Sequence, residues 1–223
     1  MWASAAPWIE NLGADSPAIL YNGGRVFDFA AGHILHERRL SAEATRQSLA
    51  LIRRDPELQP HLFLDDRVYV ERCHPVTDAY LDDDGLTCEV VTAFEPLLVG
   101  DPHKILVIGT SVPVEALGLA VRQAGIAVHT VQSELTYLEF LPPGTSKGTA
   151  LRAMIEALGV EATDVIAIGD GWNDMEMIEA AALGVAMGNA PEGVRARADY
   201  VCASADEDGV REVLERFVLG NGS

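Results

Sequence analysis

The chain of 223 residues has little cysteine and no long apolar run. Its three cysteines, Cys73, Cys88 and Cys202, are too few and too scattered for a disulfide framework or a zinc site. Reduced thiols are the default in the cytosol, so a cytoplasmic location is expected. No apolar run reaches the length of a membrane-spanning helix, and the N-terminus lacks the basic and then apolar pattern of a secretion signal. The sequence therefore predicts a protein that has no membrane partner.

Positive charge is also scarce, with 16 Lys and Arg residues against 34 Asp and Glu residues and a formal net charge of −18. Proteins that bind nucleic acid need basic surfaces that face the phosphates, so this balance argues against a nucleic-acid partner. The same charge repels anionic substrates, so a phosphate site would need help from a nearby cation or metal. The hydrophobic content of 48% is sufficient for a folded core, and nothing in the sequence sets the oligomeric state.

The most informative stretch is IAIGDGWNDMEM, at residues 166–177. An apolar run ends abruptly at Gly-Asp-Gly and a helical spacing of apolar residues follows, which predicts a strand, a tight turn and a helix. Open α/β sheets bind their ligands at the carboxyl ends of strands, where this turn would lie. Asp170, Asn173 and Asp174 bring carboxylate and amide oxygens to the turn, and Mg²⁺ prefers such ligands. Helix capping explains one of these residues but not all three, so the sequence predicts a Mg²⁺ site.

A second candidate lies upstream, where Pro-Pro-Gly-Thr-Ser-Lys-Gly at 142–148 precedes a run with helical apolar spacing. Ser146 is the expected N-cap, which places Lys147 in the first turn of the helix. A cation is unfavourable there unless an anion neutralises it, and a phosphate at the helix N-terminus would do so. A solvated surface lysine is the simpler alternative. The position of Lys147 one strand ahead of Asp170 favours the phosphate site.

Together these segments resemble the haloacid dehalogenase-like (HAD) phosphatases, and specifically their Cof-type sugar-phosphatase group. The matching text is LEFLPPGTSKGTALRAMIEALGV, followed by DVIAIGDGWNDMEMIEAAALGVAMGNAPEGVRARADYVCASADEDGV, which together cover residues 138–210 almost without a gap. A weaker match is PAILYNGGRVFD at 17–28, which is similar to the family's strand ending in Asn-Gly.

The resemblance implies a role for each matching residue. Lys147 would hold the transferring phosphoryl group, and Asp170 would ligate Mg²⁺. Asn173 and Asp174 would complete the metal and phosphate shell, and Asn22 with its neighbour Gly23 would line the core side of the site. The implied substrate is a small phosphorylated sugar or a related metabolite, and the implied cofactor is Mg²⁺.

One part of the family pattern is missing from the expected place. Family members begin with an apolar strand ending in Asp-x-Asp-Gly-Thr, whose first Asp attacks phosphorus, and a second strand ends in Thr-Gly-Arg. The opening MWASAAPWIENLGADSPAILYNGG is instead similar to the family's helix after Thr-Gly-Arg. We therefore expect a chain that starts inside the core domain because its start is truncated, with a genuine start there as the alternative. As given, it is expected to hydrolyse phosphate esters poorly or not at all.

A superficial match to the nucleophile motif occurs at Asp82-Asp83-Asp84-Gly85-Leu86-Thr87. The motif needs a buried apolar strand before it, whereas the preceding residues are PVTDAYL. Three aspartates before a glycine are typical of a solvated hairpin turn, and we predict a turn here.

The expected fold class is α/β: a Rossmann-like parallel-sheet core, N-terminally incomplete, with an inserted α/β cap domain. Residues 1–40 and 142–219 would form the two parts of the core, residues 41–141 the cap, and residues 220–223 a disordered tail. A helix is expected at 41–54 with Ser41 as its N-cap. Glu139, on a strand predicted at 137–141, is a candidate for substrate binding if it faces the cleft, although a half-exposed strand position is the simpler explanation of a charged residue there.

Two classes of function remain open. The first is a Mg²⁺-dependent hydrolase of small phosphate monoesters with Lys147 and Asp170 as catalytic residues. The second is a non-catalytic protein that binds Mg²⁺ or a sugar phosphate, or a fragment complemented by another chain. The specific phosphorylated substrate does not follow from the sequence.

Overall fold

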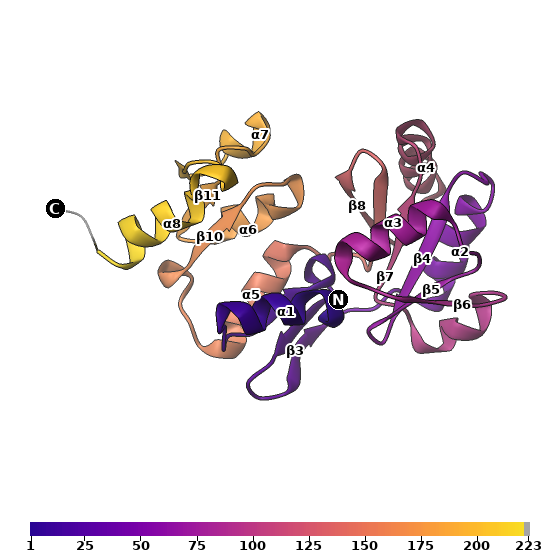
Figure 1. The fold of residues 1–223 in the computed structure, drawn as a ribbon, viewed down its shortest axis with the longest axis horizontal. Coiled ribbons are helices and arrows are strands. Elements are labelled where there is room, and N and C mark those ends of the chain that lie inside the picture. The colour runs from indigo at the N-terminus through magenta and orange to yellow at the C-terminus, as the bar shows by residue number, and fades with distance from the viewer. Residues whose placement is uncertain (221–223) are drawn as a thin grey trace. The chain divides into compact units, whose positions relative to one another are not determined.

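The structure is a computed structural model that describes residues 1–220 (Figure 1). It divides into two compact units, Met1–Thr145 and Ser146–Ser223. The division of the first unit into a core part and a cap remains a prediction. Of the predicted disordered tail, residues 221–223 lie outside the described residues.

The first unit contains two sheets and four α-helices. A short antiparallel sheet has the order β1-β2-β3, and a six-stranded sheet has the order β6-β5-β4-β7-β9-β8. The second sheet is mixed, because β5 and β6 pair in parallel and the other neighbours are antiparallel. The elements are α1 Trp2–Leu12, β1 Ala18–Leu20, β2 Arg25–Asp28, β3 His33–Glu37, α2 Ala42–Ile52, β4 Gln59–Leu64, β5 Arg67–Val70, α3 Pro75–Asp84, β6 Cys88–Val90, β7 Lys104–Ile108, α4 Ser111–Ala124, β8 His129–Glu134 and β9 Tyr137–Leu141, with 3-10 turns at Tyr21–Gly23 and Glu95–Gly100.

Strand β7 shows how the six-stranded sheet is buried on both faces. Successive side chains of a strand point to opposite sides. Ile105 and Val107 pack in a cluster with α2 and α4, whereas Leu106 and Ile108 pack in a second cluster with α3. All four side chains are almost fully buried, so an uninterrupted apolar run replaces the alternation expected of a half-exposed strand.

The second unit is a three-stranded parallel sheet of order β10-β11-β12 with short helices. On the central strand, Ala186 packs in one apolar cluster and Val185 in another, so both faces are again covered. The elements are α5 Lys147–Leu158, β10 Ile166–Gly169, α6 Met175–Ala180, β11 Leu183–Ala186, α7 Glu192–Arg195, β12 Tyr200–Val201 and α8 Gly209–Val213, with 3-10 turns at Ala162–Asp164, Trp172–Asp174 and Ala205–Glu207 and a π-helical turn at Leu214–Val218. The α/β class is confirmed, with one parallel, one mixed and one short antiparallel sheet.

The hairpin turn predicted at Asp82–Asp84 is wrong. These aspartates form the exposed last turn of α3, and Gly85 ends the helix in the left-handed conformation with φ of 64°. A C-terminal glycine in that conformation is a common helix stop, and a composition rule for turns does not distinguish the two. The residues before the aspartates are helical, so they also lack the strand that the nucleophile motif needs.

The other boundaries follow local signals. Ser41 caps α2 by accepting a hydrogen bond from the Ala44 N–H at 3.1 Å, as its position before an apolar-periodic run predicts. Among residues 1–220, no helix is both long enough and apolar enough to cross a membrane.

Candidate active site

The turn after β10 is organised around the carboxylate of Asp174. This residue is only 4% exposed. Its Oδ2 accepts hydrogen bonds from the backbone N–H groups of Asp170 and Gly171, both at 3.0 Å. A charged acceptor strengthens both bonds, so Asp174 fixes the backbone at the carboxyl end of the strand.

Lys147 meets the other oxygen of the same carboxylate. Its Nζ lies 2.5 Å from Asp174 Oδ1, which joins the first residue of α5 to the turn after β10. Ser146 is the N-cap of α5, as predicted, and accepts from the Thr149 N–H at 3.1 Å. The anion that neutralises Lys147 in this structure is therefore Asp174. The Lys147 side chain keeps 29% of its surface exposed, so the ammonium can still meet a second anion.

Two glycines allow these elements to approach closely. A Cβ on Gly169 would lie 2.4 Å from the Cβ of Asp174, and a Cβ on Gly148 would lie 2.6 Å from the backbone of Glu176. Both distances are too short for any side chain. The glycines in the two motifs thus have a packing role, in addition to forming the turn.

Asp170 differs from Asp174 in its surroundings. It follows directly after β10, as predicted, and its residue is exposed. Its Oδ2 accepts from Asn189 Nδ2 at a long 3.4 Å, and Asn189 is itself held by the Ala205 N–H, which donates to its Oδ1 at 3.1 Å. Asn189 was not singled out from the sequence. It lies three residues after the end of β11, past Met187 and Gly188. The signal that could have found it was an apolar strand followed by a glycine and an oxygen-bearing side chain.

The donor set is suited to Mg²⁺ in its chemistry. Asp170 offers an exposed carboxylate, and Asn173 places its Oδ1 beside Gly171, where a Cβ would lie 2.5 Å from it. Mg²⁺ is usually bound by one or two carboxylates and keeps several waters. Within residues 1–220, no group of three or more His, Cys, Asp and Glu side chains is placed to hold a metal. Because both Asp174 oxygens already accept hydrogen bonds, Asp170 is the better candidate ligand, and the predicted ligand set stays a prediction.

The predicted residues of the first unit form a separate contact. Asn22 lies in the 3-10 turn Tyr21–Gly23, with φ of 51°, and its Nδ2 donates to Glu139 Oε1 at 2.9 Å. Lys104 Nζ lies 2.8 Å from Glu139 Oε2. Glu139 is 5% exposed, so the interpretation as a half-exposed strand residue is wrong: the face of β9 that carries it is covered and the charge is paired. The substrate-binding roles of Asn22, Gly23 and Glu139 remain predictions.

A buried polar network that the sequence did not indicate centres on Arg25, which is 6% exposed. Its guanidinium contacts Glu37 at 2.7 Å and Asp66 at 2.8 Å. It also contacts His103 Nε2 at 2.5 Å. A guanidinium only donates, so Nε2 must accept, and burial and the nearby guanidiniums lower the pKa of His103. The neutral ring cannot also donate from Nε2 to Glu37 Oε1, 3.2 Å away, so Arg25 is its actual partner.

The pKa of Glu37 shows the strength of this network. Burial alone would raise the pKa, but hydrogen bonds from Arg39 and Arg25 lower the pKa of Glu37 to about 2. Since Arg25 begins β2 and Glu37 ends β3, the network ties this hairpin to the turn after β4 that carries Asp66.

Comparisons with known proteins agree with this geometry. The chain is 29% identical over 215 residues to the chloroplastic endoribonuclease YBEY of Arabidopsis thaliana, a match covering 93% of the chain and 36% of that protein. It is 37% identical over 107 residues to a phosphoglycolate phosphatase of Methanothermobacter thermautotrophicus, a match covering 48% of the chain and 47% of that protein. The matches thus take in less than half the length of these two curated relatives.

A solved structure shares the fold. A haloacid dehalogenase-like hydrolase from Bacteroides thetaiotaomicron superposes with a TM-score of 0.84 at 28% sequence identity, covering 96% of the chain and 82% of that structure. The family model for haloacid dehalogenase-like hydrolases matches residues 1–214. The chain therefore belongs to the haloacid dehalogenase-like hydrolases, as its two motifs predicted.

Proposed function

We propose that the chain acts in the hydrolysis of small phosphate monoesters, with Mg²⁺ as cofactor and a sugar phosphate or related metabolite as substrate. The observation that carries the proposal is the double role of Asp174, which holds Lys147 with one oxygen and the backbone beside Asp170 with the other. A cation and an exposed carboxylate are thereby fixed on one small turn. The family membership and a phosphoglycolate phosphatase among the relatives support the same chemistry.

Each residue has a distinct proposed task. Lys147, through its exposed ammonium, binds a phosphoryl oxygen. Asp170 holds the metal, Asn173 supplies an amide oxygen nearby, and Asn189 orients Asp170 by donating from its Nδ2. Mg²⁺, when bound, supplies positive charge that offsets the charge of the phosphate. Asp174 acts as a positioning residue, since its oxygens are already engaged.

No stretch of the 223 residues has an apolar strand ending in Asp-x-Asp-Gly-Thr. Without that aspartate no covalent aspartyl-phosphate can form at the family's usual place. We therefore propose that the 223 residues alone bind Mg²⁺ and phosphate but turn over phosphate esters poorly. The non-catalytic binding protein is the second candidate.

The test is calorimetric titration of Mg²⁺, and then of inorganic phosphate, into the purified protein. Asp170→Asn should weaken Mg²⁺ binding by about tenfold or more, because a charged ligand is lost. Lys147→Ala should leave Mg²⁺ binding in place and weaken phosphate binding by a similar factor. Asp164→Asn and Arg152→Gln are matched controls, since both residues are exposed in the same unit and neither is a proposed ligand.

Phosphate release from an aryl phosphate and from phosphoglycolate then separates the two candidates. Binding without release supports the non-catalytic protein, whereas release that requires Asp170 supports the hydrolase. If Asp170→Asn binds Mg²⁺ as tightly as the wild type, the assigned ligand is wrong. If the Lys147 variant binds phosphate as well as the Arg152 control does, the phosphate assignment is wrong.

A further inference from the structure

A cavity of about 240 Å³ lies within the first unit, between the C-terminus of α2, the start of β4, the end of β5 and helix α3. None of its residues belongs to the proposed phosphate site. At about 30 Å³ for each water in the liquid, it has room for roughly eight waters, which suits a small organic molecule better than a single ion. Its lining includes Ile52, Arg53, Asp55, Leu58, Gln59 and Arg72.

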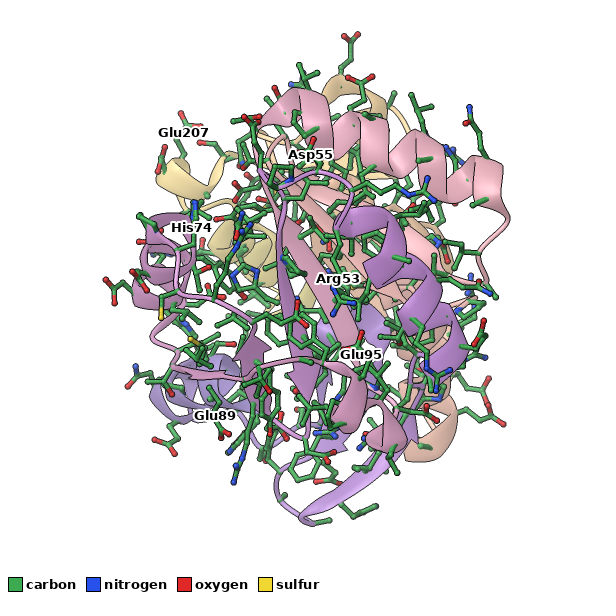
Figure 2. The ribbon with its side chains drawn as sticks, turned by 90° about the vertical axis from the view of Figure 1, so that its right-hand side faces the viewer. Arg53, Asp55, His74, Glu89, Glu95 and Glu207 are labelled. Carbon is green, nitrogen blue, oxygen red and sulfur yellow. The ribbon has the colours of Figure 1, made fainter. Side chains whose placement is uncertain are left out.

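The two arginines of the cavity are balanced differently. Arg53 lies 2.5 Å from Glu71 and 2.7 Å from Glu95, so its charge is compensated. Figure 2 shows Arg53 with Asp55 above it and Glu95 below it in that view. Arg72 donates to two neutral oxygens, Gln59 Oε1 at 2.9 Å and Pro56 O at 2.7 Å, and within residues 1–220 it forms no ion pair.

Asp55 is the negatively charged residue of the cavity whose charge is not compensated by an ion pair. Its Oδ1 accepts from the Glu57 N–H at 2.9 Å, and it forms no ion pair with any described residue. Arg72 and Asp55 therefore line one cavity as a guanidinium and a carboxylate that lie too far apart to pair with each other. A ligand that carries both charges can satisfy both groups at once.

We propose that this cavity binds a free α-amino acid with an apolar side chain. Its carboxylate pairs with Arg72, its ammonium pairs with Asp55, and its side chain packs against Pro56 and Pro60, which line the cavity and keep part of their surface exposed. A simple anion would meet Asp55 and Glu71 as well as the net charge of −18, and a simple cation would meet two guanidiniums. A zwitterion avoids both conflicts.

The polar wall of the cavity is already ordered. Gln59 is 3% exposed, and its amide group donates to Pro56 O at 3.0 Å while accepting from Arg72. Thr77 is also buried, and its hydroxyl contacts His61 Nε2 at 2.9 Å. Side chains fixed before a ligand arrives lose little entropy on binding, which favours affinity for a small molecule.

The experiment uses ligand-detected NMR and thermal shift with L-valine, L-leucine, L-methionine and L-phenylalanine. At least one of them should bind with a dissociation constant below about 10 mM and raise the melting temperature. For leucine, the matched probes are 4-methylpentanoate, which lacks the ammonium, and 3-methylbutylamine, which lacks the carboxylate. Each should bind about tenfold or more weakly, because one charge-assisted contact is lost.

The variants locate the site. Arg72→Gln and Asp55→Asn should each weaken amino-acid binding about tenfold, whereas Arg54→Gln, an exposed arginine that does not line the cavity, should leave it unchanged. Arg72→Lys keeps the charge and should retain part of the binding if Arg72→Gln proves unstable. Absence of binding by all four amino acids would overturn the proposal. So would equal binding of the singly charged analogues, or binding unaffected by both Asp55→Asn and Arg72→Lys.

Discussion

Replacing Asp174 by alanine should destabilise the second unit far more than the same replacement at an exposed carboxylate of that unit. The residue is 4% exposed, and its carboxylate accepts from three donors, at 2.5, 3.0 and 3.0 Å. Hydrogen bonds to a charged group contribute about 1.5–3 kcal/mol each, which sets an upper sum of about 4.5–9 kcal/mol. Lys147 is 29% exposed and regains water when its partner is removed, and the freed backbone N–H groups can do the same. We therefore expect a loss of about 3–5 kcal/mol.

The measurement is urea unfolding of the purified protein, followed by circular dichroism. Asp174→Ala should lower the midpoint with little change in slope, the signature of lost stability rather than a changed unfolded state. Asp174→Asn keeps an oxygen for the backbone N–H groups but loses the negative charge, so about 1–3 kcal/mol should be lost. Asp170→Ala is the matched control, four positions away but exposed, and should change the stability by less than about 0.5 kcal/mol.

A double-mutant cycle with Lys147→Met isolates the ion pair. The coupling free energy should lie between about 0.5 and 3 kcal/mol, as for residues in direct contact. A coupling near zero would show that the ion pair with Lys147 adds no stability. An Asp174→Ala protein as stable as the Asp170→Ala control would show that this carboxylate does not hold the turn.

Three further outcomes are expected. Burial raises the pKa of Glu37, but hydrogen bonds from two arginines bring this pKa from 4.5 to about 2. The stability that these bonds add is present above pH 4.5 and is lost as the pH falls toward 2. The urea midpoints of wild type and Glu37→Gln should therefore converge over that window. Gly148→Ala should cost about 1–3 kcal/mol in urea unfolding because its Cβ has no room, whereas Gly118→Ala, with ordinary contact distances on α4, should be neutral or stabilising. Lys104→Met should cost about 3–5 kcal/mol by leaving Glu139 buried without its cation, and Lys104→Met with Glu139→Gln should recover part of the loss; full stability of the single variant would contradict the pairing.

The parts of the site that the sequence predicted are the parts that local chemistry determines. An apolar strand, two glycines and a capping serine are signals within a few residues, and they placed Asp170 after β10 and Lys147 at the start of α5. The partner of Lys147 was missed, because Asp174 lies 27 residues away and only the packing of α5 on α6 brings them together. Electrostatics correctly required an anion beside Lys147, but it could not distinguish a side chain from a phosphate.

The wrong and missed predictions for the first unit have a related cause. Alternation along β9 indicates which residues share a face, but not what covers that face. Asn22, distant in sequence, and Lys104, on the neighbouring strand, meet Glu139 and bury it. The network around Arg25 joins β2, β3 and the turn after β4, and no motif marks such a set. Polar residues that become buried by tertiary contacts look like solvated residues in the sequence.

The charges of the candidate site predict that Lys147 alone would recruit a phosphate poorly. Asp174 neutralises Lys147 at 2.5 Å, and Asp170 adds a negative charge at the same turn. The three side chains therefore carry a net charge of −1, in a chain whose formal net charge is −18. An incoming phosphate anion therefore meets a repulsive field. A divalent cation held by Asp170 would reverse the sign of that local sum, from −1 to +1. Phosphate affinity should thus depend on Mg²⁺ more strongly than on Lys147, whose charge is already paired with that of Asp174.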